Sequence, residues 1–225
     1  MLLPKPRRAA GAAHGSAATA KAATSKNGLL RLLTPTILSL TGFFALLSLT
    51  NSAMQNFSVV ALLSEGITLG MANAALTAWL FGGAVGVLIG GYLADRTDRH
   101  GDVAAVGFGL TAVLVLGVAT LSLSGPVIAA TLGLAGLLSG MIMPSRDMLV
   151  RKAAPPGAAG RVFGIVSTGF NIGGIIGPLA FGWIMDHAKP SWVFGGAVAI
   201  MALTALVGLI GERYGDRQGA ARRVA

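Results

Sequence analysis

The stretch LGMANAALTAWLFGGAVGVLIGGYLADRTDR, residues 69–99, joins a long uncharged run to a short charged one. Its first 26 residues, 69–94, contain no Asp, Glu, Lys or Arg, and four charged residues then follow within 95–99. A helix crosses ~30 Å of hydrocarbon with about 20 apolar residues. The stretch therefore predicts one membrane-spanning helix that ends at a charged loop.

The same pattern recurs along the rest of the chain. Charge-free gaps of 33, 29, 43, 24 and 22 residues separate Arg31 from Glu65, Glu65 from Asp95, Asp102 from Arg146, Arg161 from Asp186, and Lys189 from Glu212. The longest gap has room for two spans, and the turn signal Ser124-Gly125-Pro126 divides it. We therefore expect an all-α polytopic membrane protein whose six spans are Thr36–Leu63, Leu69–Ala94, Val103–Leu123, Val127–Ser145, Val162–Met185 and Trp192–Gly211.

Composition agrees with this fold class. Of the 225 residues 54% are hydrophobic and 11% are charged, and the mean hydropathy is +0.74. Soluble domains have ~25% charged residues. The net charge of +9 would suit a nucleic-acid binder, but this hydropathy does not, so no nucleic-acid partner is expected. The lack of cysteine excludes disulfides, thiolate metal sites and cysteine nucleophiles.

The cations predict the orientation of the spans. Six spans place both termini and the second and fourth connections on one side, and Lys189 is the one basic residue expected on the other side. The positive-inside rule then makes both termini cytoplasmic, and we expect an integral protein of a bacterial inner membrane. The sixteen cations of the cytoplasmic side are Lys5, Arg7, Arg8, Lys21, Lys26, Arg31, Arg96, Arg99, Arg146, Arg151, Lys152, Arg161, Arg213, Arg217, Arg222 and Arg223.

Two basic tails flank the predicted bundle. Residues 1–34 contain six cations and no acid, and we expect a disordered cytoplasmic tail there. This segment lacks the apolar core of a signal peptide, although it loosely fits a mitochondrial transit peptide. We expect the six-helix bundle over 35–212 and a second basic cytoplasmic tail over 213–225.

Glycines recur every four residues within three of the spans. Small residues at this spacing lie on one helix face and allow two helix backbones to approach closely. The pattern indicates tight packing, and smooth faces of this kind also let bundles rock against each other; Pro144 and Pro178 add sites of bending. The three glycine faces are Gly82, Gly86 and Gly90, then Gly136 and Gly140, then Gly169, Gly173 and Gly177.

The loop after the second span resembles a signature of the major facilitator superfamily of secondary transporters. That signature runs G-x-L-A-D-R-x-G-R-[RK] and follows the second span of a six-helix half. Asp98 and His100 depart from it. The positions that match are Gly91, Leu93, Ala94, Asp95, Arg96 and Arg99.

The resemblance implies a gating role for these residues. In the family the aspartate caps a neighbouring helix N-terminus, and here that aspartate would be Asp95. The bases form a charge network between the two halves, and here the network base would be Arg99. The fifth span also resembles the family's glycine–proline helix motif. The gating and conformational residues implied are Gly91, Asp95, Arg96, Arg99, Gly177 and Pro178.

The resemblance covers about 32–211 and points to a C-terminal half. The fourth span lacks the embedded arginine that first halves often carry, and the segment Met143-Pro144-Ser145-Arg146-Asp147 looks like the fourth-to-fifth connection of a second half. Each half of the family is built from two inverted repeats of three helices. A full member has about twelve spans, so the chain corresponds to one 3+3 half.

Two other interpretations of the loop stay open. Its arginines could simply fix topology in a solvated loop. Alternatively Asp95, Asp98 and Asp102 would cluster on a helix and bind Mg²⁺, as in membrane phosphatidyltransferases, although the Asp-Gly and Ala-Arg pairs of those enzymes are missing. We expect no bound metal, cofactor or catalytic residue.

Polar residues within spans mark a candidate substrate cavity. Asn51, Gln55 and Ser48 belong to a polar stripe on the first span, and Asn171 lies in the fifth. These four are the predicted substrate-binding residues; the alternative is hydrogen bonding between helices. None of the predicted spans contains a charged residue, and Asp147 falls just beyond the fourth, so a coupling carboxylate is expected in another half or not at all.

The resemblance predicts a secondary transporter of a small solute that works by alternating access. One bundle forms one wall of a cavity, so the expected partners besides the lipid bilayer and the solute are a second copy or a missing N-terminal half. The alternatives are a nontransporting membrane interaction subunit, an inactive truncated product and the Mg²⁺-dependent phosphatidyltransferase.

Overall fold

The computed structural model describes residues 33–97 and 99–224, and side chains up to residue 208. The chain divides into two compact units, Met1–Pro35 and Thr36–Ala225, and the fold lies in the second. The tail predicted over 1–34 falls almost wholly outside the described residues. The elements are α3 (Pro35–Ser52), the π-helical turn η1 (Ala53–Phe57), α4 (Ser58–Ser64), α5 (Leu69–Ala94), α6 (His100–Thr120), α7 (Gly125–Ala153), α8 (Ala159–His187) and α9 (Trp192–Val224).

The all-α fold class is confirmed. Five helices are long and apolar enough to cross a membrane, and Trp192–Gly208, the part of the sixth helix whose side chains are described, is also apolar. The first is the continuous run Pro35–Ser64, in which α3, η1 and α4 follow one another without a break. The second span has the predicted bounds, 69–94.

Two helices are longer than the charge pattern predicts. The fourth span was expected to end at Ser145, but α7 continues to Ala153, and α9 runs past the expected Gly211 to Val224. Charged residues mark the edge of the hydrocarbon, whereas a helix ends where its backbone is interrupted. The interruption after α7 is Pro155-Pro156-Gly157, where the glycine has φ of 77°.

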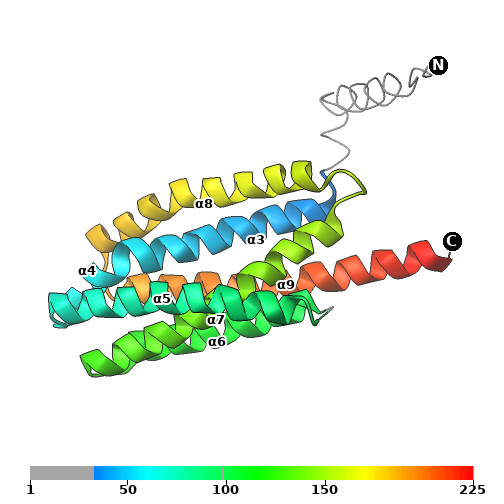
Figure 1. Cartoon of the computed structure of the whole chain (residues 1–225). Coiled ribbons are helices and arrows are strands. Elements are labelled where there is room, and N and C mark those ends of the chain that lie inside the picture. The colour runs from blue at the N-terminus through cyan, green and yellow to red at the C-terminus, as the bar shows by residue number, and fades with distance from the viewer. Residues whose placement is uncertain (1–32, 98, 225) are drawn as a thin grey trace, which may run out of the picture. The chain divides into compact units, whose positions relative to one another are not determined.

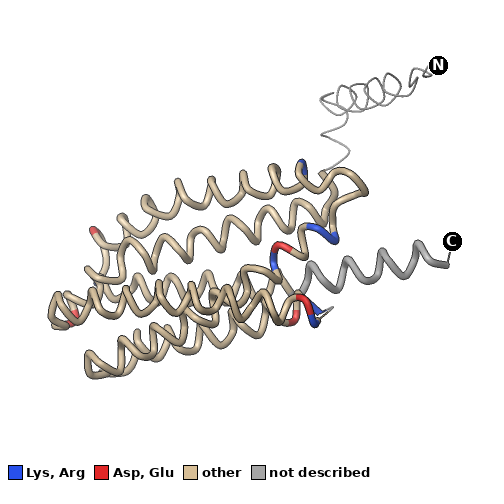
Figure 2. Tube along the Cα trace, in the orientation of Figure 1, with Lys and Arg blue, Asp and Glu red and all other residues tan. Residues whose placement is uncertain are grey.

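The helices lie side by side, and successive helices run in opposite directions (Figure 1). α5 packs against α7, and α6 packs against α7 and α9. In Figure 1 the last part of α7 leaves α5 and α6 and rises toward α3 and α8. Figure 2 shows that the visible basic segments gather at one end of the bundle, where α3 begins; we call it the cation-rich end.

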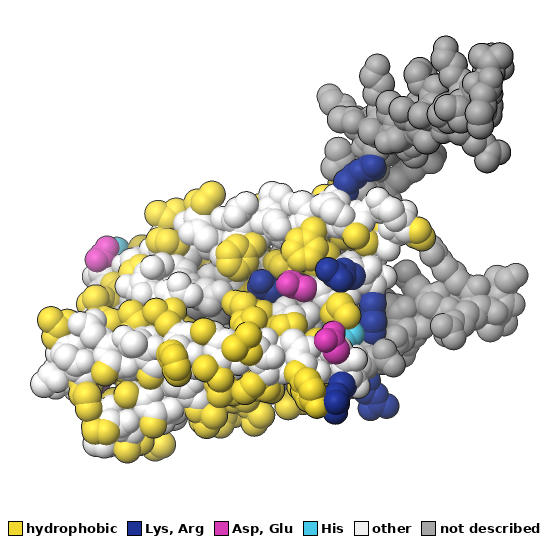
Figure 3. Space-filling model, viewed as in Figure 1, with side chains coloured by type: hydrophobic (Ala, Val, Ile, Leu, Met, Phe, Trp, Pro, Cys, Tyr) yellow, Lys and Arg dark blue, Asp and Glu magenta, His cyan; other side chains and the backbone are white. Residues whose placement is uncertain are grey.

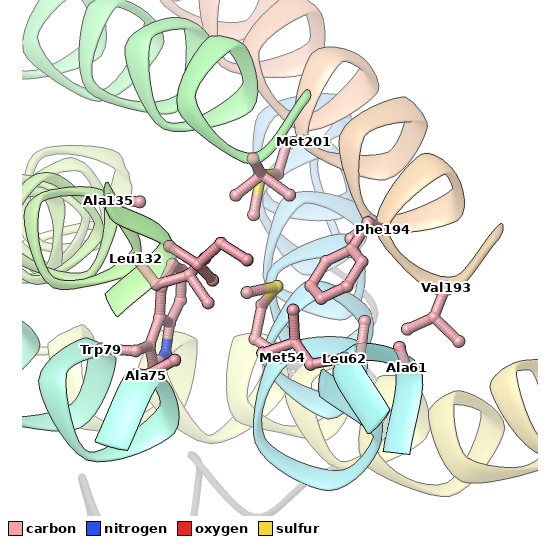
Figure 4. Packing of buried hydrophobic residues seen from close by; sticks show 14 of the residues in the cluster. Met54, Ala61, Leu62, Ala75, Trp79, Leu132, Ala135, Val193, Phe194 and Met201 are labelled. Atoms are coloured by element: carbon pink, nitrogen blue, oxygen red, sulfur yellow. The ribbon is translucent and has the colours of Figure 1, made fainter. Parts of the chain in front are cut away.

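The apolar core lies toward the opposite end of the bundle. Figure 4 shows side chains of η1, α4, α5, α7 and α9 gathered around Met54, whose exposed fraction is 1%. Large apolar side chains also cover the outside of the helices, as lipid-facing surfaces require. The core includes Met54, Leu62, Trp79, Leu132, Phe194 and Met201, and the exposed apolar residues include Phe81, Leu88, Ile176, Leu179 and Trp183.

The glycines of α5 and α7 form a backbone-to-backbone seam. A methyl group at Gly86 would overlap the carbonyl of Leu137, and one at Gly90 would lie 2.6 Å from Cα of Met141. The seam is reciprocal, because Gly140 of α7 meets the carbonyl of Gly83 in α5. The remaining members are Gly82, which meets Gly133, and Gly136, which meets Trp79.

A second seam joins α8 to α3. A methyl group at Gly169 would overlap the carbonyl oxygen of Thr41, and one at Gly173 would overlap that of Ala45. A methyl group at Gly177 would meet the side chain of Ser52. Lipid provides no hydrophobic drive between helices, so van der Waals contact at such close approach supplies much of the association. The packing role predicted for the three glycine faces is therefore confirmed.

The α5–α7 seam makes one substitution costly and its neighbour harmless. Gly86→Ala should lower the free energy of unfolding by about 1–3 kcal/mol, because the methyl group meets backbone that cannot move aside. Gly83→Ala, whose methyl group would lie 3.7 Å from the Gly136 oxygen, should be neutral or slightly stabilising. Unfolding of the detergent-solubilised chain measures both, and equal stability of the two variants would contradict the seam.

Candidate functional site

An ion pair lies within the last turns of α7. Nε of Arg146 is 3.3 Å from Oδ1 of Asp147, and the exposed fractions of the two side chains are 16% and 44%. The two groups are close enough to pair as charges, but they are not aligned as a hydrogen bond. Nε and one terminal nitrogen of Arg146 are buried without a hydrogen-bond acceptor among the described residues.

Two aromatic rings flank the Arg146 guanidinium. Its Cζ lies 4.7 Å from the ring centroid of Phe44 on α3 and 6.0 Å from that of Phe170 on α8. A guanidinium this close to an aromatic face is stabilised by the ring quadrupole. Arg146 therefore connects three helices, and its charge lies among them rather than in solvent.

Helix geometry explains how the charge reaches this position. Arg146 precedes the end of α7 at Ala153 by about 10 Å, at ~1.5 Å per residue. Side chains of a helix tilt toward its N-terminus, which for α7 is the end away from the cations. An arginine facing lipid would turn its charge toward the nearer interface, whereas Arg146 directs it at Phe44 and Phe170.

Arg146 was not predicted as a site residue, because the charge pattern places Arg146 and Asp147 beyond the fourth span. The structure places both residues inside α7. One signal could have found them: no Pro or Gly lies between Arg146 and Pro155, so the helix has no reason to stop at the first charge.

The polar stripe of the first span divides into buried and accessible residues. Ser48 is 3% exposed and lies against Gly173 and Gly174 of α8, so it belongs to the seam. Asn51 is half-buried and Gln55 is exposed. The pattern thus includes one packing residue and two residues that a solute could contact.

Asn51 and Gln55 lie on the same face of the first span as Phe44, the ring that contacts Arg146. Positions 44, 51 and 55 are separated by seven and four residues, which is the repeat of one helix face. Gln55 lies in η1, where one wider turn interrupts the α-helix; such turns are frequent at functional sites. The neighbouring Asn56 donates a hydrogen bond to Oγ of Ser52 at 3.2 Å, so it is engaged within the helix.

The fifth span contributes less polarity to this face. Asn171 is exposed on α8 and follows Phe170, the ring near Arg146. Pro178 lies inside α8 and directly follows Gly177, which packs against the side chain of Ser52 in α3. Figure 3 shows charged side chains among the apolar side chains on one face of the bundle. The charged residues of α7 are Arg146, Asp147, Arg151 and Lys152.

The charged residues of the loop between α5 and α6 make contacts within their own bundle. Asp95 is the C-cap residue of α5, and the guanidinium of Arg96 stacks 4.2 Å from the ring centroid of Tyr92, a contact that the sequence analysis did not anticipate. The backbone N–H of Arg99 donates to Oγ1 of Thr97 at 3.2 Å. A methyl group at Gly91 would meet none of the described atoms within 4 Å, so the space on that side of the glycine is open.

The Mg²⁺ alternative loses its geometric basis. It required Asp95, Asp98 and Asp102 on one helix, but Asp95 caps α5 and Asp102 lies in the first turn of α6. Asp98 lies outside the described residues. Among the residues that the structure describes, none form a cluster of metal-binding side chains.

Comparison with known proteins identifies the family. A model of the Major Facilitator Superfamily matches residues 38–224, which is most of the chain. The chain belongs to this superfamily.

Similar proteins are longer than this chain. The uncharacterized MFS-type transporter Rv1877 of Mycobacterium tuberculosis is 30% identical over 122 residues, which are 53% of this chain and 17% of that protein. Rv1250 of the same organism, also an uncharacterized MFS-type transporter, is 29% identical over 154 residues, 68% of this chain and 26% of that one. The matches thus span about a sixth to a quarter of these relatives.

A solved structure shares the fold. The crystal structure of a peptide transporter, POT, in its E310Q mutant form with alafosfalin, superposes with a TM-score of 0.68 at 20% sequence identity. The superposition covers 79% of this chain and 38% of the transporter.

The ion pair in α7 predicts the effect of removing its acid. Asp147→Asn leaves the guanidinium of Arg146 without its neighbouring charge, and stability should fall by about 1 kcal/mol; the 3–5 kcal/mol of a buried pair is discounted because Asp147 is 44% exposed. Asp186→Asn, at an exposed acid near the end of α8, should change stability little. Chemical unfolding in detergent measures the difference, and equal losses would argue against a structural role of the pair.

Proposed function

We propose that the chain forms one six-helix half of a secondary transporter and that a small solute binds against the face shared by α3, α7 and α8. The observation that carries this proposal is Arg146, whose guanidinium is largely buried among three helices, beside Asp147 and close to two aromatic rings. Ionisable residues within membrane bundles are costly and usually mark solute or ion pathways. Asn51 and Gln55 would supply polar contacts farther along the same face.

The second wall of the cavity would come from another six-helix bundle. The superposition on the peptide transporter uses 79% of this chain but only 38% of that structure, which leaves room there for a bundle of similar size. That bundle could be a second copy of this chain, a separate chain or the rest of a longer one. Alternating access would then be rocking of the two bundles about the solute.

The loop after α5 would gate the cavity at the cation-rich end. Asp95 and Arg99 lie in this bundle, and their proposed partners would belong to the second bundle. The partner of Asp95 would be a helix N-terminus, and the partners of Arg99 would be acidic residues. A methyl group at Gly91 would meet no described atom within 4 Å, so this side of the glycine is open to that approach. Gly177 and Pro178 would let α8 bend as the bundles move.

The orientation follows from the charges. The cation-rich end would face the cytoplasm, because basic connections are retained there during insertion. Both termini would then be cytoplasmic, in a bacterial inner membrane.

Accessibility to water tests the cavity, and the chain suits this test because it contains no cysteine. Cysteine introduced at Gln55 should react with a water-soluble methanethiosulfonate more than about tenfold faster than cysteine at Ile176, an exposed apolar position on α8. The reason is that lipid suppresses the reactive thiolate. Equal rates at the two positions would mean that Gln55 also faces lipid.

Flux tests transport itself. Proteoliposomes containing the chain with its partner should accumulate one member of a panel of radiolabelled small solutes. Asn51→Ala or Gln55→Ala should weaken the apparent affinity about 5- to 10-fold, the equivalent of one lost hydrogen bond. Asn73→Ala, at an exposed asparagine near the start of α5, is the matched control and should behave as the parent chain.

Two outcomes would contradict transport. A stable complex without flux of any solute favours the nontransporting interaction subunit. A chain that acquires no partner and moves no solute favours an inactive product.

A further inference from the structure

We propose that Arg146 binds an oxyanion, such as a carboxylate, phosphonate or phosphate group, with the edge of its guanidinium that Asp147 leaves free. The inference deepens the proposed function and rests on it for one point only, namely that the oxyanion belongs to the transported solute. The binding group itself is argued from the contacts of Arg146.

The guanidinium of Arg146 has hydrogen-bond donors that no described residue accepts. A guanidinium has five N–H donors in a planar fork and no acceptor. One terminal nitrogen of Arg146 is buried without an acceptor among the described residues, and the Nε contact with Asp147 is not aligned as a hydrogen bond. Buried donors are nearly always paired in folded proteins, so these two nitrogens without an acceptor require an explanation.

A purely structural role for Arg146 explains this arrangement poorly. A cation near a helix C-terminus commonly interacts with the free carbonyl groups and with the helix dipole. In α7 that place is taken by Arg151 and Lys152, which lie in the last turn. Arg146 instead extends to rings on two other helices, Phe44 and Phe170, neither of which accepts a conventional hydrogen bond.

The surroundings favour an anion over a neutral ligand. Phe44 is 3% exposed, so one side of the guanidinium is dry, and a charge-assisted hydrogen bond is stronger where water is excluded. The Asp147 side chain as a whole is 44% exposed, but its Oδ1 is buried beside Nε of Arg146, so Asp147 pairs with the Nε edge of the guanidinium. A ligand carboxylate or phosphonate would match the terminal nitrogens of the guanidinium with two parallel bonds.

Access for a ligand comes from the same face as the proposed cavity. The side chain of Arg146 is 16% exposed as a whole, although Nε and one terminal nitrogen are buried, so a ligand would approach through the remaining exposed part; Asn51 and Gln55 continue this face of α3 away from Phe44. A solute whose anionic group lies on Arg146 could therefore reach these amides with its polar remainder. The substrate class implied is a small organic anion that carries additional hydrogen-bonding groups.

Protection from a guanidinium reagent tests the inference without any flux. The purified full chain is treated with phenylglyoxal, and modification of Arg146 and of Arg151, the exposed arginine on the same helix, is followed by peptide mass spectrometry. Methylphosphonate at ten times its dissociation constant should slow the reaction of Arg146 about 10-fold, because only about one site in eleven then stays free. Arg151 should react at an unchanged rate.

The controls separate specific binding from ionic strength. Methylammonium chloride at the same ionic strength should protect neither residue. In a thermal-unfolding assay methylphosphonate should raise the midpoint of the parent chain and of Arg151→Gln, but not that of Arg146→Lys, which keeps the charge and loses the fork. Arg146→Lys retains the cation near the rings, so its folding is expected to survive.

The results distinguish this inference from the proposed function. Equal protection of Arg146 and Arg151, or none at either residue, overturns the oxyanion site even if the reconstituted protein transports a solute. Selective protection of Arg146 supports the site, and it would do so even if flux were never detected.

Discussion

Close contact between helix backbones at two glycine seams holds α5 against α7 and α3 against α8. In lipid the helices gain little by hiding apolar surface from one another, since lipid tails are equally apolar. The carbonyl groups of Leu137 and Met141 lie on Gly86 and Gly90, and the carbonyl groups of Thr41 and Ala45 lie on Gly169 and Gly173. Side chains at these positions would separate α5 from α7 and α3 from α8.

The seams also determine where the charged pair of α7 lies. The first seam holds α7 against α5 as far as Gly140, and Pro144 and Arg146 follow directly. Proline removes a backbone donor from the helix, so α7 can turn there, and its last part rises toward α3 and α8 in Figure 1. The second seam sets α8 against α3, so the rings of Phe44 and Phe170 both reach the same guanidinium.

Much of the fold was predictable because lipid imposes simple rules on sequence. The bounds of α5 and the glycine faces were correct, since hydrocarbon thickness and small-residue spacing are strong constraints. The end of α7 was wrong because charges were taken as helix ends, when the interruption comes at Pro155. The stacking of Phe44 on Arg146 could not be predicted, because it joins two helices about a hundred residues apart in the sequence.

The central claim is that the face carrying Gln55 is covered by a second bundle, whereas the face carrying Ile176 meets lipid. Photocrosslinking in native membranes tests this most directly, with benzoylphenylalanine placed at either position and the products identified by mass spectrometry. The account predicts that position 55 crosslinks to a six-helix polypeptide segment and that position 176 crosslinks to lipid. Lipid adducts at both positions would contradict it, because the proposed cavity would then have no second wall.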